Sequence, residues 1–147
     1  KNYPIEYLKN KSANDKYPDS LTKKLAKYNS NVYDDIYEMV ILDDFVINDK
    51  IIENICDDLD HYFEIYGPGD EESQKFTKNI SLFLTLISKR PLHPYSEDKK
   101  DEIYFSNGKY YCKNRVKYIN DERSLCRYCI CRNVGFMDML WLQYIIF

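Results

Sequence analysis

The sequence predicts a mostly α-helical, bundle-like fold with one β-hairpin near residues 101–114; an α+β arrangement is the alternative. Apolar residues recur at helical spacing over residues 48–67 and again over residues 74–90. An Asn107-Gly108 pair, which favours a tight turn, lies between two runs of alternating aromatic residues. A chain of 147 residues is also long enough to bury a core of its own.

The domain organisation follows from where proline and polar residues collect. Residues 1–18 are polar and contain two prolines, so we expect an irregular N-terminal arm. Residues 19–147 are expected to form a single globular domain, helical over residues 19–90. A proline-containing loop over residues 91–100 precedes the hairpin and a cysteine-containing helical part, which together cover residues 101–147.

The helices differ in how strongly the sequence marks them. A short helix over residues 21–28 should end at the polar Asn-Ser-Asn sequence that follows, before near-helical apolar spacing resumes over residues 32–47. The strongest helix is residues 48–67, where Asn48 or Asp49 can cap the first turn and Gly67 can end the last. The acids of residues 68–73 suit the start of the next helix.

The C-terminal third continues with two further elements. A helix is expected within residues 120–133, which begin with a cap-like Asn120 and two acids. Residues 134–147 are expected to form a final buried helix or strand. No apolar run reaches the roughly 18 residues that a membrane helix needs, so we expect no membrane span within residues 1–147.

Charge is strongly segregated although the net charge is only −3. Residues 34–72 carry fourteen acids and one base, whereas residues 109–132 carry seven bases and two acids. Helical spacing places four acids in one stripe: Glu53, Asp57, Asp60 and Glu64. This stripe is either a solvated helix face, partly neutralised by the chain's own bases, or a docking face for a protein with a basic surface.

A second candidate binding region is the tyrosine-rich basic hairpin, which includes Tyr110 and Tyr111. Tyrosine suits protein interfaces because it combines apolar area with a polar tip. Interleaved aromatic and basic residues also suit single-stranded nucleic acid. The acidic block would repel phosphates, however, and none of the common nucleic-acid-binding motifs is present. Nucleic acid is therefore not the expected partner.

Four of the five cysteines have the spacing C-x13-C-x2-C-x-C: Cys112, Cys126, Cys129 and Cys131. They allow three interpretations, namely a zinc site, at least one intramolecular disulfide, or reduced and mostly buried thiols. Against zinc, the spacing lacks two C-x2-C pairs, and a helix would turn Cys131 away from Cys126 and Cys129. No cofactor other than zinc is indicated.

The chemical state of the cysteines also determines in which compartment we expect the protein. Disulfides would place it outside the cell, at a cell surface or in a host cell, whereas reduced or metal-bound thiols would place it in the cytoplasm. Lys, Asn, Asp, Tyr and Ile are abundant, and this set includes residues with A/T-rich codons. We therefore expect a pathogen with an AT-rich genome, either a virus or a protozoan parasite.

No catalytic constellation of side chains is evident, so we do not expect an enzyme. The expected function is a protein–protein interaction domain that binds its partner, and in a pathogen its host, through the acidic stripe or the tyrosine-rich hairpin. The alternatives are a small zinc-stabilised module organised by the four cysteines and a structural subunit of a larger assembly. The identity of the partner and the oligomeric state stay open.

Overall fold

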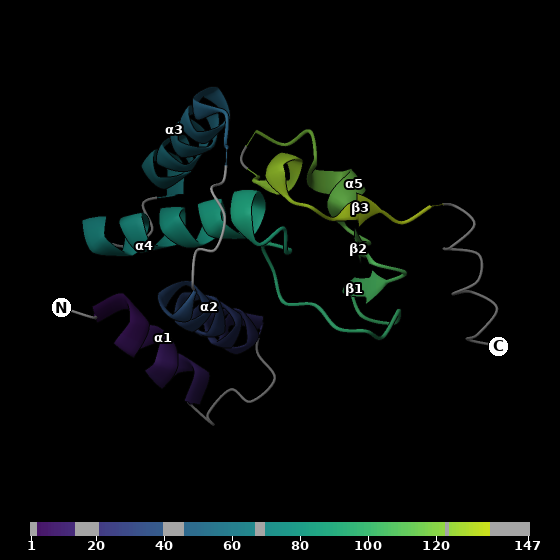
Figure 1. Ribbon diagram of the computed structural model, residues 1–147, viewed down its shortest axis with the longest axis horizontal. Coiled ribbons are helices and arrows are strands. Elements are labelled where there is room, and N and C mark those ends of the chain that lie inside the picture. The colour runs from purple at the N-terminus through teal and green to yellow at the C-terminus, as the bar shows by residue number, and fades with distance from the viewer. Residues whose placement is uncertain (1–2, 14–20, 40–45, 67–69, 123, 136–147) are drawn as a thin grey trace. The chain divides into compact units, whose positions relative to one another are not determined.

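The computed structural model confirms a mostly helical chain with a small three-stranded sheet (Figure 1). It describes residues 3–13, 21–39, 46–66, 70–122 and 124–135. The chain divides into two compact units, Lys1–Pro94 and Tyr95–Phe147, with the boundary inside the loop expected over residues 91–100. The assignment of residues 19–147 to a single domain stays a prediction.

The irregular N-terminal arm is wrong over residues 3–13, because Tyr3–Ala13 form helix α1. Ile5 is buried in unit 1, and α1 packs on the next helix. Lys9 Nζ also donates a hydrogen bond to Asp34 Oδ1 on that helix, at 3.3 Å. Proline is tolerated in the first turn of a helix, where its missing N–H has no partner in any case. Packing of an apolar side chain therefore orders a segment whose composition indicated a loop.

Helix α2 runs without interruption from Leu21 to Glu38, so the expected break at the Asn-Ser-Asn sequence is wrong. Ser30 and Val32 are both buried, and this tertiary packing outweighs the weak helix propensity of the polar residues. Helical structure ends at Glu38 rather than continuing to residue 47, and residues 40–45 lie outside the described residues.

Helix α3, Asp49–Tyr66, has almost the predicted bounds. Asn48 Oδ1 accepts a hydrogen bond from the Lys50 N–H at 2.9 Å, as expected of a capping side chain. The buried face carries Ile55, Leu59 and Phe63 at the predicted spacing. The predicted terminator, Gly67, lies outside the described residues.

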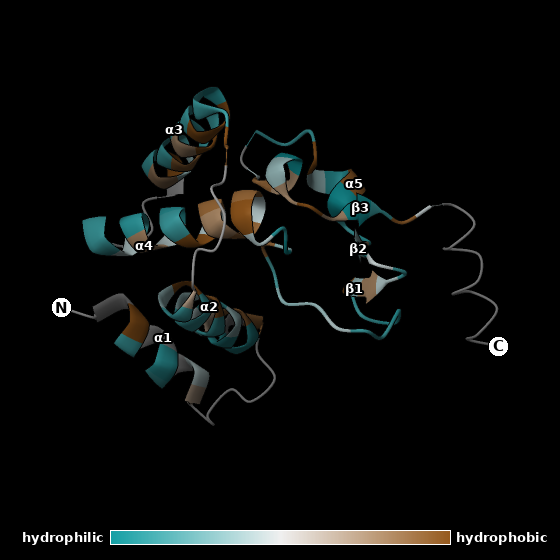
Figure 2. Cartoon of the chain, viewed as in Figure 1, coloured by the Kyte–Doolittle hydropathy of each residue, from teal (hydrophilic) through white to brown (hydrophobic). Residues whose placement is uncertain are grey.

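Helix α4, Glu71–Leu82, continues into the π-helical turn η1, Phe83–Ile87. Figure 2 shows its hydropathy changing from hydrophilic at the N-terminal end to hydrophobic towards the C-terminal end. The core of unit 1 forms around four buried residues, Val32, Ile80, Phe83 and Leu84. Half-buried Phe76 and Ile87 pack against it, which confirms the apolar stripe predicted for residues 74–90.

The N-terminal cap of α4 gives a pH-dependent prediction. Asp70 Oδ1 accepts a hydrogen bond from the Ser73 N–H at 2.8 Å, and this bond lowers the pKa of the Asp70 carboxyl. A group with a lowered folded-state pKa stabilises the fold above its unfolded-state pKa, and this contribution is lost as the pH falls through the folded-state pKa. Asp70→Asn keeps an acceptor but cannot titrate, so its thermal unfolding should depend less on acid than that of the unmodified protein.

The check is a set of melting curves between neutral pH and pH 3, with Glu72→Gln as the matched control. Glu72 lies in the same first turn of α4, so the control removes a carboxylate without removing the cap. An Asp70→Asn variant that loses as much stability in acid as the unmodified protein would contradict the assignment.

Unit 2 begins with the predicted hairpin, formed by β1, Ile103–Ser106, and β2, Lys109–Cys112. The turn residues Asn107 and Gly108 have φ values of 51° and 73°, in the left-handed region that this type of turn requires. A third strand, β3, Arg132–Asn133, pairs in parallel with β2. The sequence did not indicate this strand.

The helix expected within residues 120–133 is wrong. The described residues of this stretch contain only the short 3-10 turn η2, Cys126–Tyr128, before the chain extends into β3. A separate short helix, α5, Arg115–Tyr118, follows β2 directly. The final element expected over residues 134–147 lies outside the described residues from residue 136 onward. None of the described helices combines the length and hydropathy of a membrane span.

Candidate functional site

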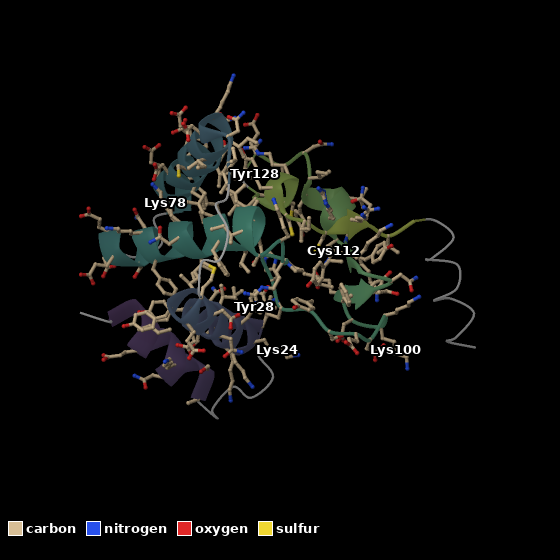
Figure 3. The ribbon with its side chains drawn as sticks, viewed as in Figure 1. Lys24, Tyr28, Lys78, Lys100, Cys112 and Tyr128 are labelled. Carbon is tan, nitrogen blue, oxygen red and sulfur yellow. The ribbon has the colours of Figure 1, made fainter. Side chains whose placement is uncertain are left out.

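The structure brings three of the four predicted cysteines together in unit 2, a group that we call the thiol cluster: Cys112, Cys129 and Cys131. Cys112, labelled in Figure 3, is the last residue of β2, and the parallel pairing of Cys112 with Asn133 draws the residues before β3 alongside it. A side-chain hydrogen bond joins Cys129 and Cys131, and electrostatic interaction links both of them to Cys112. Cys131 is buried, and the other two are half-buried.

Backbone conformation explains why Cys129 and Cys131, but not Cys126, belong to the thiol cluster. Cys129 is extended, with φ −68° and ψ 139°, and in an extended chain the residues i and i+2 lie on the same face. The prediction that Cys131 turns away from Cys129 is therefore wrong, because it assumed a helix. Cys126 is half-buried at the start of η2, where its N–H donates to Ser124 Oγ at 3.1 Å.

Two main-chain donors point at the Cys112 sulfur, namely the N–H groups of Asn114 and Arg115. Burial raises the pKa of the Cys112 thiol, and these two hydrogen bonds oppose that effect because they stabilise the thiolate. The turn that presents them is held by Glu102, whose Oε1 accepts from Asn114 Nδ2 at 2.6 Å and whose carbonyl accepts from the Lys113 N–H at 3.0 Å.

The pKa of Cys131 is raised further. The hydrogen bond with Cys129 is the largest cause, followed by burial and by the negative charges that Cys129 and Cys112 carry when they ionise. The Arg115 guanidinium opposes the rise. Cys112 and Cys131 are consequently protonated thiols at neutral pH, unlike the low-pKa cysteines of enzymes that use a thiolate nucleophile.

Arg115 is the basic residue of the cluster. Its Nε donates to the Cys131 carbonyl at 2.5 Å, so the side chain ties the start of α5 to the segment that carries Cys129 and Cys131. Its Nη1 is buried and has no hydrogen-bond partner among the described residues. Sequence reasoning did not place Arg115 in this site, although its position three residues after Cys112 was visible.

All five cysteines are free thiols, so the interpretation with at least one intramolecular disulfide is wrong. The physical reason lies in the geometry of the cluster, where a hydrogen bond rather than a covalent bond joins Cys129 and Cys131. In the described part of the chain, no group of three or more His, Cys, Asp or Glu side chains is placed so that it could hold a metal ion.

The four acids predicted to form a stripe are all exposed on α3: Glu53, Asp57, Asp60 and Glu64. Two of them have basic neighbours within unit 1. Asp60 Oδ1 lies 2.5 Å from Nζ of Lys78, labelled in Figure 3, and Glu64 Oε2 lies 3.9 Å from His61 Nδ1. Glu53 and Asp57 form no ion pair with any described residue. We call the four residues the acidic surface.

Tyr110 and Tyr111 lie on opposite faces of the hairpin, as consecutive strand residues must. The Tyr110 ring lies 4.8 Å from the rings of both Phe105 and Tyr95, and the Tyr111 ring stacks on Tyr104 at 5.4 Å. Both tyrosines are half-buried. Much of their surface is therefore used within unit 2, and the acidic surface is the more accessible of the two predicted binding regions.

Comparison with known proteins places the chain in a family. The model of DUF2115, described as an uncharacterized protein conserved in archaea, matches residues 6–134. The chain belongs to this family. A UPF0305 protein of Methanocaldococcus jannaschii is 24% identical over 122 residues, which cover 80% of this chain and 74% of that protein. A UPF0305 protein of Methanococcus maripaludis strain C6 is 30% identical over 96 residues, which cover 64% of this chain and 58% of that protein. No solved structure matches the chain.

Membership of DUF2115 corrects the expected source. The family is archaeal, and both relatives come from archaea, so the virus or protozoan origin and the interaction with a host are wrong. The error arose because abundant Lys, Asn, Tyr and Ile reflect a nucleotide bias that is not confined to pathogens. The amino-acid composition indicates a nucleotide bias, but it does not indicate which group of organisms the protein comes from.

Proposed function

We propose that this DUF2115 protein is a non-enzymatic binding protein and that its acidic surface binds another protein through a basic patch. The observation that carries the proposal is the exposure of all four acids along one helix, of which Glu53 and Asp57 form no ion pair with a described residue. A partner with basic side chains would supply the missing counter-charges and would be attracted before contact.

The charge of the surrounding unit supports the same proposal. Residues 1–94 carry seventeen acids and twelve bases, whereas residues 95–147 carry seven acids and nine bases. The acidic surface therefore lies in the part of the chain with net negative charge, whose field extends over about one Debye length, roughly 8 Å at physiological salt. Salt should weaken binding for this reason.

The chemistry of the described residues supports a role without catalysis. The raised pKa values of Cys112 and Cys131 disfavour a nucleophilic thiolate at neutral pH. His61 lies exposed on α3 beside Glu64, and His93 is exposed in the loop after η1. Neither arrangement offers the buried, oriented base that acid–base catalysis requires.

The test compares two charge-reversed variants as bait for proteins from a Methanococcus maripaludis extract. Glu53→Lys/Asp57→Lys alters the acidic surface. Glu38→Lys/Glu97→Lys makes the same change in net charge at two other exposed acids. We expect the first variant to lose about tenfold or more of the captured partner, corresponding to about 1.4 kcal/mol or more, while the control retains it.

Quantitative mass spectrometry at two salt concentrations gives the readout. The proposal requires that the captured protein be basic, that its capture fall with salt, and that it be crosslinked to α3. Equal retention by both variants, or capture that does not depend on salt, would refute it.

A further inference from the structure

We propose that Cys112, Cys129 and Cys131 bind one zinc ion and that Arg115 positions this site. The inference concerns unit 2 and does not depend on the proposed partner of the acidic surface. Its basis is the convergence of three thiols from two segments, since sixteen residues lie between Cys112 and Cys129 along the chain. Thiolates are the ligands that zinc prefers in structural sites, where three cysteines and a further ligand are a common set.

The hydrogen bonds around Cys112 are those expected of a zinc ligand. Main-chain N–H groups of the second and third residues after the cysteine, Asn114 and Arg115, both donate to its sulfur. Donors aimed at a ligand sulfur hold the ligand in place and stabilise its negative charge, which is the role of outer groups at metal sites. Here the turn after β2 provides them, and the hydrogen bond from Asn114 to Glu102 fixes that turn.

Charge balance gives the second argument. Three thiolates placed together would repel one another, and a divalent cation removes this repulsion by binding all three. Zinc with three thiolates leaves one negative charge, and the Arg115 guanidinium supplies one positive charge. Its buried Nη1, which has no acceptor among the described residues, would then donate to a zinc-bound sulfur.

Zinc binding would need the cysteine side chains to change their positions. The Cys129 and Cys131 side chains hydrogen-bond to each other, and as placed the three cysteines do not form a group that could hold a metal ion. Rotation about the Cα–Cβ bonds of these cysteines would have to bring the three sulfurs around one point. The ion would tie β2 to the segment preceding β3, across the parallel pairing of these strands.

The first experiment measures zinc binding by the full chain, kept reduced and freed of metal with a chelator. Titration against a chromophoric zinc chelator should give one ion per chain. Cys112→Ser and Cys131→Ser should each weaken zinc binding by about 100-fold, whereas Cys56→Ser, on α3 in unit 1, should leave it unchanged. A Cys112→Ser/Cys129→Ser/Cys131→Ser variant that binds zinc like the unmodified protein would overturn the proposal.

Arg115→Gln tests the positioning role. We expect a 10- to 100-fold loss of zinc affinity, with the cobalt-substituted form keeping the thiolate-to-metal absorption of the unmodified protein, because the ligands themselves are intact. Unchanged affinity would refute the role of Arg115.

A measurement on the unmodified protein guards against variants that fail to fold. X-ray absorption of the zinc-loaded chain should show at least three sulfur atoms at about 2.3 Å. A first shell dominated by nitrogen or oxygen, or binding of less than one ion per chain at micromolar zinc, would overturn the proposal.

Discussion

Leu84→Ala is expected to lower the free energy of unfolding of unit 1 by about 2–5 kcal/mol, the range typical of a leucine truncated inside a packed core. Leu84 is 1% exposed and packs with Val32, Ile80 and Phe83, which come from two different helical segments. Removing its methyl groups loses apolar burial and leaves a cavity between α2 and the end of α4. Chemical denaturation followed by circular dichroism measures the loss.

The matched control for this prediction is Leu21→Ala. Leu21 is 71% exposed at the start of α2, so the same truncation should change stability by less than about 0.5 kcal/mol. If the two variants unfold at the same denaturant concentration, the core assigned to unit 1 is wrong.

Ile103→Ala is expected to have an effect of similar size in unit 2, about 2–5 kcal/mol. Ile103 is 7% exposed on β1 and pairs with Cys112 on β2, so it supports the strand that presents the thiol cluster. Ile103 and its neighbour Tyr104 are the two buried residues of β1, so truncating Ile103 removes much of the buried aliphatic area of a small sheet. Hydrogen exchange should therefore accelerate at the amides of β1 and β2 while that of α2 and α4 stays slow.

Val116→Ala provides the comparison within unit 2. Val116 is 65% exposed on α5, and alanine is the better helix former, so exchange in β1 and β2 should stay unchanged. Acceleration of α2 and α4 by Ile103→Ala would show that the two units unfold together rather than as separate cooperative blocks.

Most of the helical structure could be predicted from the sequence because amphipathic spacing is a local property. The stripe over residues 48–67 was sufficient for α3, and the Asn107-Gly108 pair was sufficient for the hairpin turn. Helices α1 and α2 show the limit of this reasoning. Their extents depend on the burial of Ile5 and Ser30 by distant parts of the chain, which local propensity does not reveal.

The two candidate sites differ in the same way: local sequence patterns predict one of them, and the other depends on tertiary structure. The exposed position of Glu53 and Asp57 on α3 follows from helical spacing alone. The grouping of Cys112 with Cys129 and Cys131 does not, because it depends on the parallel pairing of β2 with β3, a strand of two residues that leaves almost no pattern in the sequence.

The parallel pairing of β2 with β3 also has a consequence for the order of folding. The hairpin of β1 and β2 closes over a two-residue turn, whereas β3 reaches β2 only after the chain between Cys112 and Arg132 has formed a loop. Closing the longer loop carries the larger entropic cost, and non-local contacts form more slowly than local ones. We therefore expect the hairpin to form before β3 pairs with it, so that the three cysteines meet late in the folding of unit 2.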